Sequence, residues 1–245
     1  MLTEPSFAGQ IAVVTGASSG IGKAITLALA KHGATVCLVG RNLRALESVA
    51  DSVRMMASQA LCYAADLTVD EDIWQLRERI RQDFEYVDIL LHSAGFISLG
   101  VIETASLKDF DRHFRTNVRG PYALTQALLP MLKVRQGQIV FINSSAALNA
   151  RANVGQYAAS KHALKAIADC LREEVNADGI RVLSVYPGRT ATPMQALVHE
   201  LEGRVYDPSK FMQPEDVASV VVSALSLPRS AEVTDLHVRP MQKFA

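Results

Sequence analysis

The segment Thr15-Gly16-Ala17-Ser18-Ser19-Gly20-Ile21-Gly22 joins a strand-length apolar run, Gln10–Thr15, to a segment with helical periodicity, Ile21–His32. Glycine is needed where a chain turns tightly between two such elements, because a Cβ would obstruct the close approach of backbone. A helix beginning near Gly20 directs unpaired N–H groups and the positive end of its dipole at an anion. The segment therefore predicts a site for the pyrophosphate of a dinucleotide, formed by Gly16, Ser18, Ser19, Gly20, Ile21 and Gly22.

The same residues also fit Gly-x-Ser-x-Gly, which is the nucleophile turn of α/β-hydrolases and lies between a strand and a helix as well. That fold takes an oxyanion donor from a loop that precedes the nucleophile in the chain. Only about ten residues precede this turn, and they hold no such strand. We therefore favour the dinucleotide site.

Apolar runs of strand length alternate with helical patterns along the rest of the chain. The predicted strands are Gln10–Thr15, Thr35–Val39, Ala60–Ala64, Asp88–His92, Gln138–Asn143, Ile180–Tyr186 and Val233–Val238. The predicted helices are Ile21–His32, Leu43–Met56, Asp70–Phe84, Tyr122–Val134, Tyr157–Asn176 and Pro214–Leu225. This order predicts an α/β protein with a doubly wound, parallel, seven-stranded sheet and helices on both faces, a Rossmann fold forming a single domain over residues 1–245.

The composition argues against several classes of partner. Basic and acidic residues balance at 25 each, so neither a nucleic acid nor an anionic membrane surface is an expected partner. Three scattered cysteines without a Cys-x-x-Cys pair are typical of reduced thiols in a cytoplasmic protein. Residues 1–5 do not resemble a signal peptide, and no histidine spacing indicates a metal site.

The end of the second predicted strand, Leu38-Val39-Gly40-Arg41-Asn42, bears on the choice of dinucleotide. NAD sites place a carboxylate there, about 20 residues past the glycines, to accept hydrogen bonds from the ribose. This strand ends without an acid, and Arg41 instead offers a guanidinium suited to the 2′-phosphate of NADP. An ordinary solvated arginine is the other interpretation. Asp66, before Leu67, is placed to reach the adenine or, as an alternative, to cap a helix.

Tyr157-Ala158-Ala159-Ser160-Lys161 places a phenol and an amine four residues apart, on one face of a helix. A cation ~5 Å away at an effective dielectric of ~20 supplies about 3.3 kcal/mol. That exceeds the ~2.7 kcal/mol needed to lower a phenol pKa by ~2 units from its usual value of about 10. Lys161 could therefore activate Tyr157, although such a pair also arises by chance. Ser144 and Ser145, after the fifth strand, could bind the substrate oxygen or form a polar turn.

Seven elements in order resemble the short-chain dehydrogenase/reductase family over nearly the whole chain. They are Thr15-Gly16-x-x-x-Gly20-Ile21-Gly22, Asp66, Ala94-Gly95, Asn117, Ser144, Tyr157-x-x-x-Lys161 and Pro187-Gly188. The resemblance implies Tyr157 as acid/base, Ser144 as anchor of the substrate oxygen, Lys161 as ribose ligand and activator, and Asn117 as holder of a relay water. The family's serine-to-tyrosine spacing favours Ser144 over Ser145.

The resemblance also implies an NADP(H) site that spans the chain, and an assembly. Its residues would be the glycine segment, Arg41, Asn42, Asp66, Leu67, Ser93, Ala94, Gly95, Tyr157, Lys161, Pro187, Gly188, Thr190 and Thr192. Thr192 would contact the nicotinamide carboxamide, and residues 190–213 would form a lid whose apolar side chains could equally be a packing stripe. A homotetramer or homodimer is implied.

Two departures from the family pattern stand out. His92-Ser93 replaces the usual Asn-Asn before Ala94-Gly95, so His92 is expected to act as a hydrogen-bonded substitute for asparagine rather than in catalysis. The usual Val-Asp-Gly-Gly ending is missing, and Glu232–Met241 instead resembles NADP-dependent reductases and hydroxy-acid dehydrogenases of the family. The expected activity is hydride transfer between NADP(H) and the carbonyl or alcohol carbon of a small ketone, aldehyde, secondary alcohol or hydroxy acid. The alternative is a catalytically silent NADP(H)-binding sensor.

Overall fold

The structure is a computed structural model that describes residues 6–242. The first five residues, on which the absence of a signal peptide was argued, lie outside the described part, as do residues 243–245. Among the described helices, none combines the length and the apolar character that crossing a bilayer requires.

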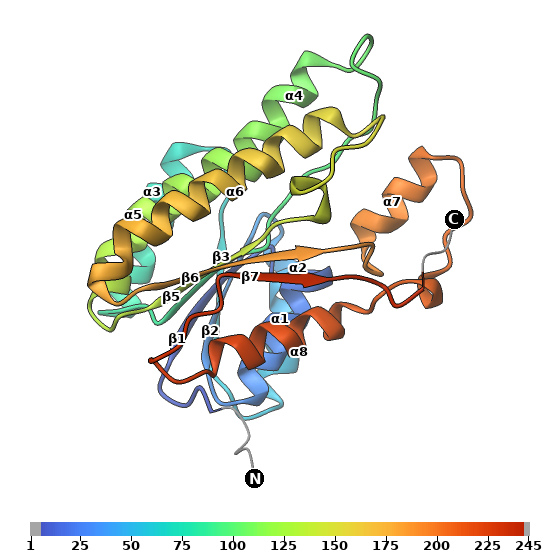
Figure 1. Ribbon diagram of the computed structural model, residues 1–245. Helices are drawn as coiled ribbons and strands as arrows, with labels where there is room; N and C mark the ends of the chain where they lie inside the picture. Colours follow the sequence, from blue (N-terminus) through green and yellow to red (C-terminus); the bar gives the residue numbers. More distant parts are fainter. Residues whose placement is uncertain (1–5, 243–245) are drawn as a thin grey trace.

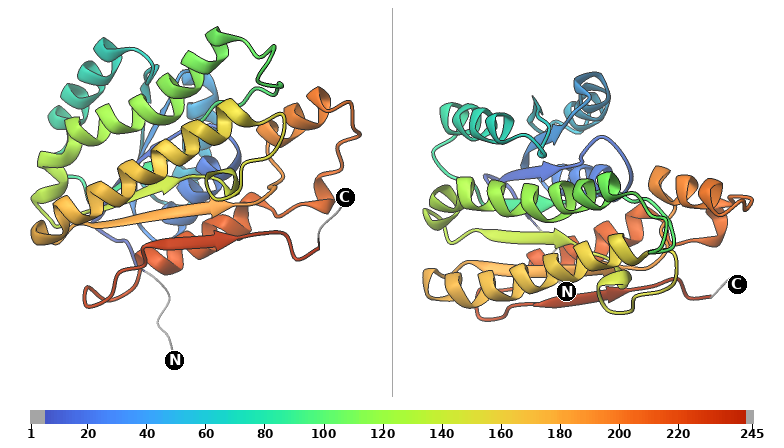
Figure 2. Two further views of the ribbon diagram at one scale, coloured as in Figure 1. Left: turned by 45° about the horizontal axis from the view of Figure 1, so that its top comes forward. Right: turned by 90° about the horizontal axis from the view of Figure 1, so that it is seen from above.

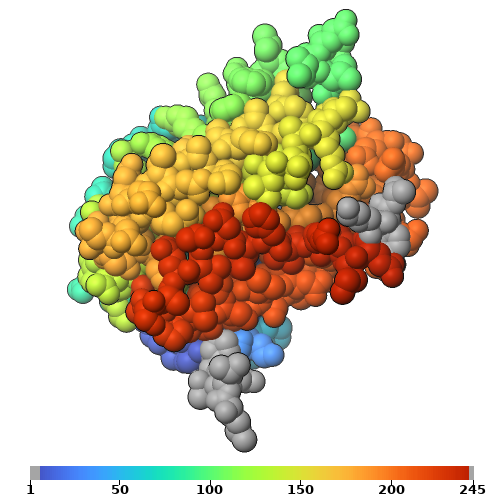
Figure 3. Space-filling view, in the orientation of Figure 1, coloured from blue at the N-terminus to red at the C-terminus, as the bar shows by residue number. Residues whose placement is uncertain are grey.

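The described residues form one parallel sheet of seven strands in the order β3-β2-β1-β4-β5-β6-β7 (Figure 1). The strands are β1 (Ile11–Thr15), β2 (Thr35–Gly40), β3 (Ala60–Ala64), β4 (Ile89–His92), β5 (Gln138–Ile142), β6 (Arg181–Pro187) and β7 (Asp235–Val238). The inner strands are buried on both faces, which explains their nearly continuous Val, Ile and Leu content. β7 lies at the edge, and its residues belong to the molecular surface (Figure 3).

Helices cover both faces of the sheet, in one layer above and one below the strands in the view of Figure 1, and the right-hand view of Figure 2 looks down on the upper layer. The helices are α1 (Gly20–Lys31), α2 (Leu43–Arg54), α3 (Asp70–Asp83), α4 (Leu107–Phe114), α5 (Gly120–Lys133), α6 (Gly155–Val175), α7 (Pro193–Leu201) and α8 (Pro214–Leu225). Short helical turns are the π-helical η1 (Arg115–Arg119) and the 3₁₀ turns η2 (Ser145–Ala147), η3 (Asn176–Asp178) and η4 (Pro208–Lys210). Apolar residues of α1, α2 and α8 pack on one face, and those of α3, α5 and α6 pack on the other.

The predicted strands and helices agree with the structure to within two residues at each end. The helix predicted to begin at Tyr157 begins at Gly155, and the last strand begins at Asp235 rather than Val233. The helix predicted over Tyr122–Val134 is too short, because α4, η1 and α5 follow one another without a break over residues 107–133. Leu107 is 80% exposed, so the first half of this helix lacks the buried apolar stripe on which periodicity depends.

The strand order places a switch point between β1 and β4. From β1 the chain builds outward to β2 and β3, and then returns to place β4 on the other side of β1. The connections after β1 and β4 therefore lead to helices on opposite faces from the carboxyl edge of the sheet, which is where such folds bind ligands. The glycine segment follows β1 and residues 93–95 follow β4, so both lie at this crevice.

Candidate active site

The glycine turn after β1 packs directly against the loop after β4. Gly16 has a positive φ of 66°, and a Cβ on it would lie 2.8 Å from the backbone nitrogen of Ala94. A Cβ on Gly22 would meet the carbonyl group of Gly16 and would lie 3.2 Å from the Ser93 hydroxyl. The Thr15 hydroxyl accepts hydrogen bonds from the Ser93 and Ala94 N–H groups, at 3.0 and 3.2 Å. The first turn and the fourth-strand loop are thus one rigid unit.

The amino end of α1 presents the anion-binding groups that the sequence predicts. Ser19 is the N-cap residue, and its side chain caps no N–H group of the helix. Gly20 has a φ of 53°, and a Cβ there would lie 3.1 Å from Cγ2 of Thr192. Uncapped N–H groups, the helix dipole and a surface kept clear of Cβ atoms are what a pyrophosphate requires. The residues present therefore fit a dinucleotide.

The residues predicted to bind the adenosine half lie at the ends of β2 and β3. Arg41 is exposed and forms no ion pair or hydrogen bond within residues 6–242, whereas the Asn42 side chain caps α2 by accepting from the Ala45 N–H at 3.2 Å. Asp66 accepts from the N–H and the hydroxyl of Thr68, at 3.0 and 2.8 Å. The suggestion that Asp66 caps a helix is wrong, because the N-cap residue of α3 is Val69.

Ser144, Tyr157 and Lys161 meet beside the carboxyl end of β5. Tyr157 and Lys161 extend from the first two turns of α6 and are buried, with exposures of 9% and 4%. The Lys161 Nζ donates to the Ile142 carbonyl at 3.0 Å and lies 5.9 Å from the centroid of the Tyr157 ring. Ser144 is half-buried and interacts with the Tyr157 phenol, whereas Ser145 is exposed. The structure therefore brings together the three groups that the sequence singled out.

Burial determines the protonation of this cluster. Loss of water raises the pKa of Tyr157 above its ordinary value, and the hydrogen bond with Ser144 opposes that rise only in part. Burial also lowers the pKa of Lys161 to about 8. The sequence predicts that the ammonium could lower the phenol pKa, but in the folded protein the net shift is upward and burial is its main cause. Tyr157 consequently holds its proton at neutral pH.

Asn117 lies in η1 and connects the loop after β4 to α6. Its amide oxygen accepts from the Phe96 N–H at 2.8 Å, and its Nδ2 donates to the Phe96 carbonyl at 2.9 Å and to the Ser160 hydroxyl at 3.0 Å. Both amide hydrogens are therefore used by protein groups. A water bound by the Asn117 side chain would have to donate to the remaining lone pair of Oδ1.

His92 ends β4 inside the protein. Its Nε2 forms a 2.8 Å hydrogen bond with the Thr125 hydroxyl, and its ring stacks on Phe141 at 4.9 Å between centroids. Burial lowers the pKa of His92 to about 3, so the ring is neutral at physiological pH. His92 therefore connects β4 to α5 through a hydrogen bond. A hydrogen-bonded role of this kind is what we expect of a residue that substitutes for asparagine.

Residues 187–213 form a further side of the crevice. The Gly188 N–H donates to the Val238 carbonyl at 2.7 Å, which fixes the turn after Pro187. Thr190 pairs with Met212, and this bridge closes the base of the segment that carries α7. Thr192 caps α7 through Gln195, and the Met194 Cε lies 3.6 Å from the position of a Cβ on Gly95. α7 therefore begins over the glycines of both crevice loops.

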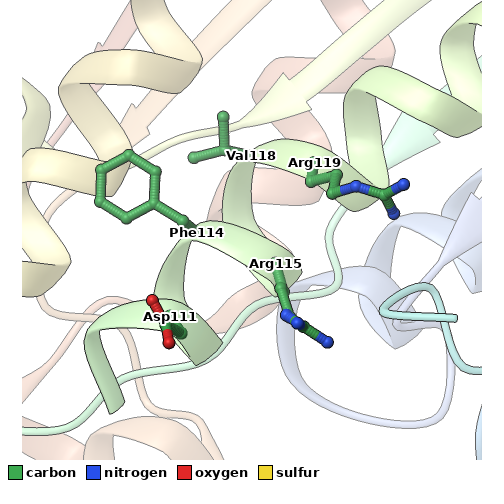
Figure 4. Close-up of a pocket in the computed structure, with 5 residues that line it drawn as sticks. All are labelled: Asp111, Phe114, Arg115, Val118 and Arg119. Carbon is green, nitrogen blue, oxygen red and sulfur yellow. The ribbon is translucent and has the colours of Figure 1, made fainter. Parts of the chain in front are cut away.

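A surface depression of about 290 Å³ lies elsewhere, on α4 and η1 (Figure 4). Its lining residues are Asp111, Phe114, Arg115, Val118 and Arg119, none of which the sequence predicted as part of the site. The depression contains two cationic side chains, Arg115 and Arg119, and Arg119 is already neutralised by an ion pair with Asp70. Within residues 6–242, no cluster of three or more His, Cys, Asp or Glu side chains could hold a metal ion.

Sequence reasoning missed three residues of the site: Thr15, Ser160 and His113. Thr15 lies in the glycine segment and Ser160 lies between Tyr157 and Lys161, so both belong to motifs already singled out. Each is a polar residue at a buried position, and that was the signal that could have identified it. His113 lies in the part of the helix that was not predicted. Its ring packs 6.1 Å from the Tyr157 ring, and no feature of the sequence indicated this contact.

Comparison with known proteins agrees with this geometry. The family model described as short chain dehydrogenase matches residues 10–202. An uncharacterised oxidoreductase of Staphylococcus epidermidis is 33% identical over 233 residues, covering 95% of this chain and 97% of the relative.

Two solved structures superpose closely. The alcohol dehydrogenase of the archaeon Thermococcus sibiricus, complexed with 5-hydroxy-NADP, has a TM-score of 0.88 and 25% identity, covering 96% of this chain and 98% of that one. A short-chain dehydrogenase of Shigella flexneri, complexed with NADP, has a TM-score of 0.87 and 31% identity, covering 94% and 97%. With the family model matching most of its length, this chain belongs to the short-chain dehydrogenase family of oxidoreductases.

Proposed function

We propose that this protein is an NADP(H)-dependent oxidoreductase that interconverts a small carbonyl compound and the corresponding alcohol, with Tyr157 as the acid/base. The observation that carries the proposal is the grouping of the buried Tyr157 and Lys161 with the half-buried Ser144 beside a glycine crevice fit for a dinucleotide. A buried cluster of titratable groups with perturbed pKa values at a ligand edge is typical of an active site.

Tyr157 is the proton donor in the direction of reduction. Its pKa lies above the ordinary value, so the phenol carries its proton at neutral pH and can release it only to a stronger base, such as a carbonyl oxygen that gains negative charge. Ser144, whose hydroxyl acts on the pKa of the phenol, would hydrogen-bond the same oxygen. In the reverse direction the phenolate takes up the alcohol proton, and the Lys161 ammonium stabilises it.

The bound dinucleotide supplies or accepts the hydride. The glycine segment and the amino end of α1 would hold its pyrophosphate, and Lys161 would hold a ribose hydroxyl. The walls around the nicotinamide would be formed by Ser93 to Gly95, Pro187, Gly188 and Thr190. The Thr192 hydroxyl accepts a hydrogen bond in capping α7, so it still has its own hydrogen to donate to the carboxamide. Asn117 would hold a relay water. The segment of residues 190–213 would act as a lid.

Turnover is tested by following NADPH oxidation against a panel of ketones, aldehydes and keto acids, with Tyr157→Phe beside the parent protein. Loss of the general acid typically costs about 10²–10⁴-fold in kcat. Tyr122→Phe is the matched control, because Tyr122 is 52% exposed on α5. Equal rates in the parent and Tyr157→Phe would remove Tyr157 from the mechanism. NADPH binding without turnover of any substrate would favour the sensor alternative instead.

Preference for NADP over NAD is assigned to Arg41. The side chain is exposed and free of protein partners within the described residues, no carboxylate ends β2, and two similar structures hold NADP or a derivative of it. Arg41→Asp should lower kcat/KM for NADPH relative to NADH by about tenfold or more, because an acid repels the 2′-phosphate. Arg44→Asp, which changes an exposed arginine in the first turn of α2, is the control. An unchanged ratio in Arg41→Asp would contradict this assignment.

We also propose that the protein acts in the cytoplasm as a homodimer or homotetramer. Burial raises the pKa of Cys37 and Cys62 to about 12, which agrees with reduced thiols. Ile102, Leu107 and Tyr122 are each at least half exposed, and such side chains are commonly covered by a partner. Sedimentation equilibrium would measure the assembly.

A further inference from the structure

His113 is a completely buried side chain on α4, a helix whose other residues are exposed or only partly buried. Its Nε2 lies 3.1 Å from the backbone N–H of Ser98, and its Nδ1 lies 2.8 Å from the carbonyl oxygen of Asp109. The first partner can only donate and the second can only accept, so Nε2 carries a lone pair and Nδ1 carries the hydrogen. The two backbone groups therefore hold the ring neutral and in one tautomer.

His113 and Asn117 hold the same loop. Asn117 pairs with both backbone groups of Phe96, and His113 accepts from Ser98 two residues further on. On the opposite side, each of the two side chains meets α6. Asn117 donates to Ser160, and the His113 ring packs against the Tyr157 ring. His113 is thus a second bridge between the loop after β4 and the helix that carries Tyr157.

The contact between His113 and Tyr157 is made by the rings themselves. Their centroids lie 6.1 Å apart at an interplanar angle of 62°, an edge-to-face arrangement. The centroid of the Phe96 ring lies 4.8 Å from that of the imidazole, with the planes tilted by 51°, and the Arg112 guanidinium lies 3.9 Å from the centroid of Phe96. The Tyr157 ring therefore packs against an imidazole that contacts a further ring and is itself fixed by two hydrogen bonds.

We propose that His113 is a positioning residue for the reaction, a neutral imidazole whose ring holds the Tyr157 ring in place and keeps water from that side of it. This proposal deepens the function proposed above and rests on it. Substrate is not expected to touch His113, because both ring nitrogens are occupied by backbone groups.

The charges around His113 are consistent with a neutral ring. Burial is the main cause that lowers its pKa below the usual value; Asp109 opposes this and Arg112 adds to it, both from its own helix. From α6 the ring faces the Tyr157 phenol, and the segment Phe96–Ser98 contributes no titratable side chain. A protonated imidazole would direct an N–H group at the Ser98 N–H and lose that hydrogen bond.

The test compares His113→Ala, which removes the ring, with His113→Phe, which keeps a ring and loses both hydrogen bonds. Phe110→Ala is the control for loosening α4, because Phe110 lies on the same helix and packs against Phe114 at 4.9 Å. The pKa of Tyr157 is measured by ¹³C NMR on protein labelled at the tyrosine Cζ, with Tyr157→Phe assigning the signal. The kcat for carbonyl reduction is measured alongside.

In His113→Ala we expect the pKa of Tyr157 to fall by ~0.5 unit or more, because water reaches the phenol and relieves its desolvation. We expect kcat to fall by roughly 10-fold or more, because the phenol loses its fixed position. His113→Phe should keep the parental pKa and recover most of the kcat, and Phe110→Ala should resemble the parent protein.

Two results would overturn the proposal. If His113→Ala has the same Tyr157 pKa as Phe110→Ala, the ring does not shield the phenol. If His113→Phe behaves like His113→Ala, the imidazole acts only as a clamp on the loop. The NMR titration needs neither cofactor nor turnover, so it decides the role of His113 even if the protein reduces no carbonyl compound and the proposed function fails.

Discussion

Gly9 and Gly16 share a backbone conformation but differ in what surrounds them. Their φ angles are 74° and 66°, both in the left-handed region. A Cβ on Gly9 would meet nothing within 4 Å, whereas one on Gly16 would lie 2.8 Å from the Ala94 nitrogen. The pair therefore separates the cost of an unusual backbone angle from the cost of a close approach.

Gly9→Ala should lower the free energy of unfolding by about 1 kcal/mol, the strain of a left-handed alanine. Gly16→Ala should lower it by about 2–4 kcal/mol, since overpacking against backbone adds to the same strain. Only Gly16→Ala should abolish NADPH binding. Urea unfolding and NADPH fluorescence measure the two effects. Similar losses of stability in both variants would mean that the contact with Ala94 contributes nothing.

At the scale of single residues, the sequence predicted a role wherever the residue type serves few purposes in proteins. The glycines, Tyr157 and Lys161 could be assigned because their spacing matches a known chemistry. The pKa of Tyr157 could not, because it depends on how much water the folded protein removes from the phenol. The contact between His113 and Tyr157 joins residues 44 positions apart, and only the packing of α4 on α6 creates it.

Among the elements, the continuous helix formed by α4, η1 and α5 differs most from expectation. Its π-helical turn carries Asn117, whose amide satisfies three groups of two other segments. Ser106 caps α4 by accepting from Asp109, and the Ser-x-x-Asp spacing was a visible start signal. Periodicity still failed there, since the apolar side chains of α4 point largely to solvent. No sequence pattern marks a π-helical turn.

Asn117→Ala should lower the free energy of unfolding by about 2–4 kcal/mol, because it leaves the Phe96 N–H, the Phe96 carbonyl and Ser160 without their partner. Asn42→Ala is the comparison, because Asn42 caps α2 at an exposed site and its loss should cost about 1 kcal/mol. Urea unfolding monitored by circular dichroism gives both values. If the two variants lose the same stability, Asn117 does not hold the loop and α6 together.

For the molecule as a whole, the alternation of strands and helices was enough to predict the fold. Strands buried on both faces of a parallel sheet are apolar along nearly their whole length, so the inner strands could be found as runs of apolar residues. The rule of right-handed crossovers predicted helices on both faces, whereas the order of the strands across the switch point was not predicted. The position of α7 over the crevice did not follow from either argument, because it depends on the bridge between Thr190 and Met212.

The buried His92 should make the whole molecule sensitive to acid. Its pKa is about 3 when folded and about 6.5 when unfolded, so its stabilising effect is complete above pH 6.5 and is lost as the pH falls toward 3. By pH 5 the loss should reach about 2 kcal/mol. The free energy of unfolding of His92→Asn should therefore fall less between pH 7 and pH 5 than that of the parent. His162→Asn, an exposed control, should follow the parent; an equally steep fall in His92→Asn would contradict this account.

The hydrogen bonds of residues 93–98 have a dynamic consequence. The amide hydrogens of Ser93, Ala94, Phe96 and Ser98 are all held by side chains, although none of these residues belongs to a helix or strand. Exchange of these hydrogens with deuterated solvent requires the glycine turn or the helix of Asn117 to separate from them. The amide hydrogens of this irregular stretch should thus exchange as slowly as those of a sheet. Their protection would report on both halves of the crevice at once.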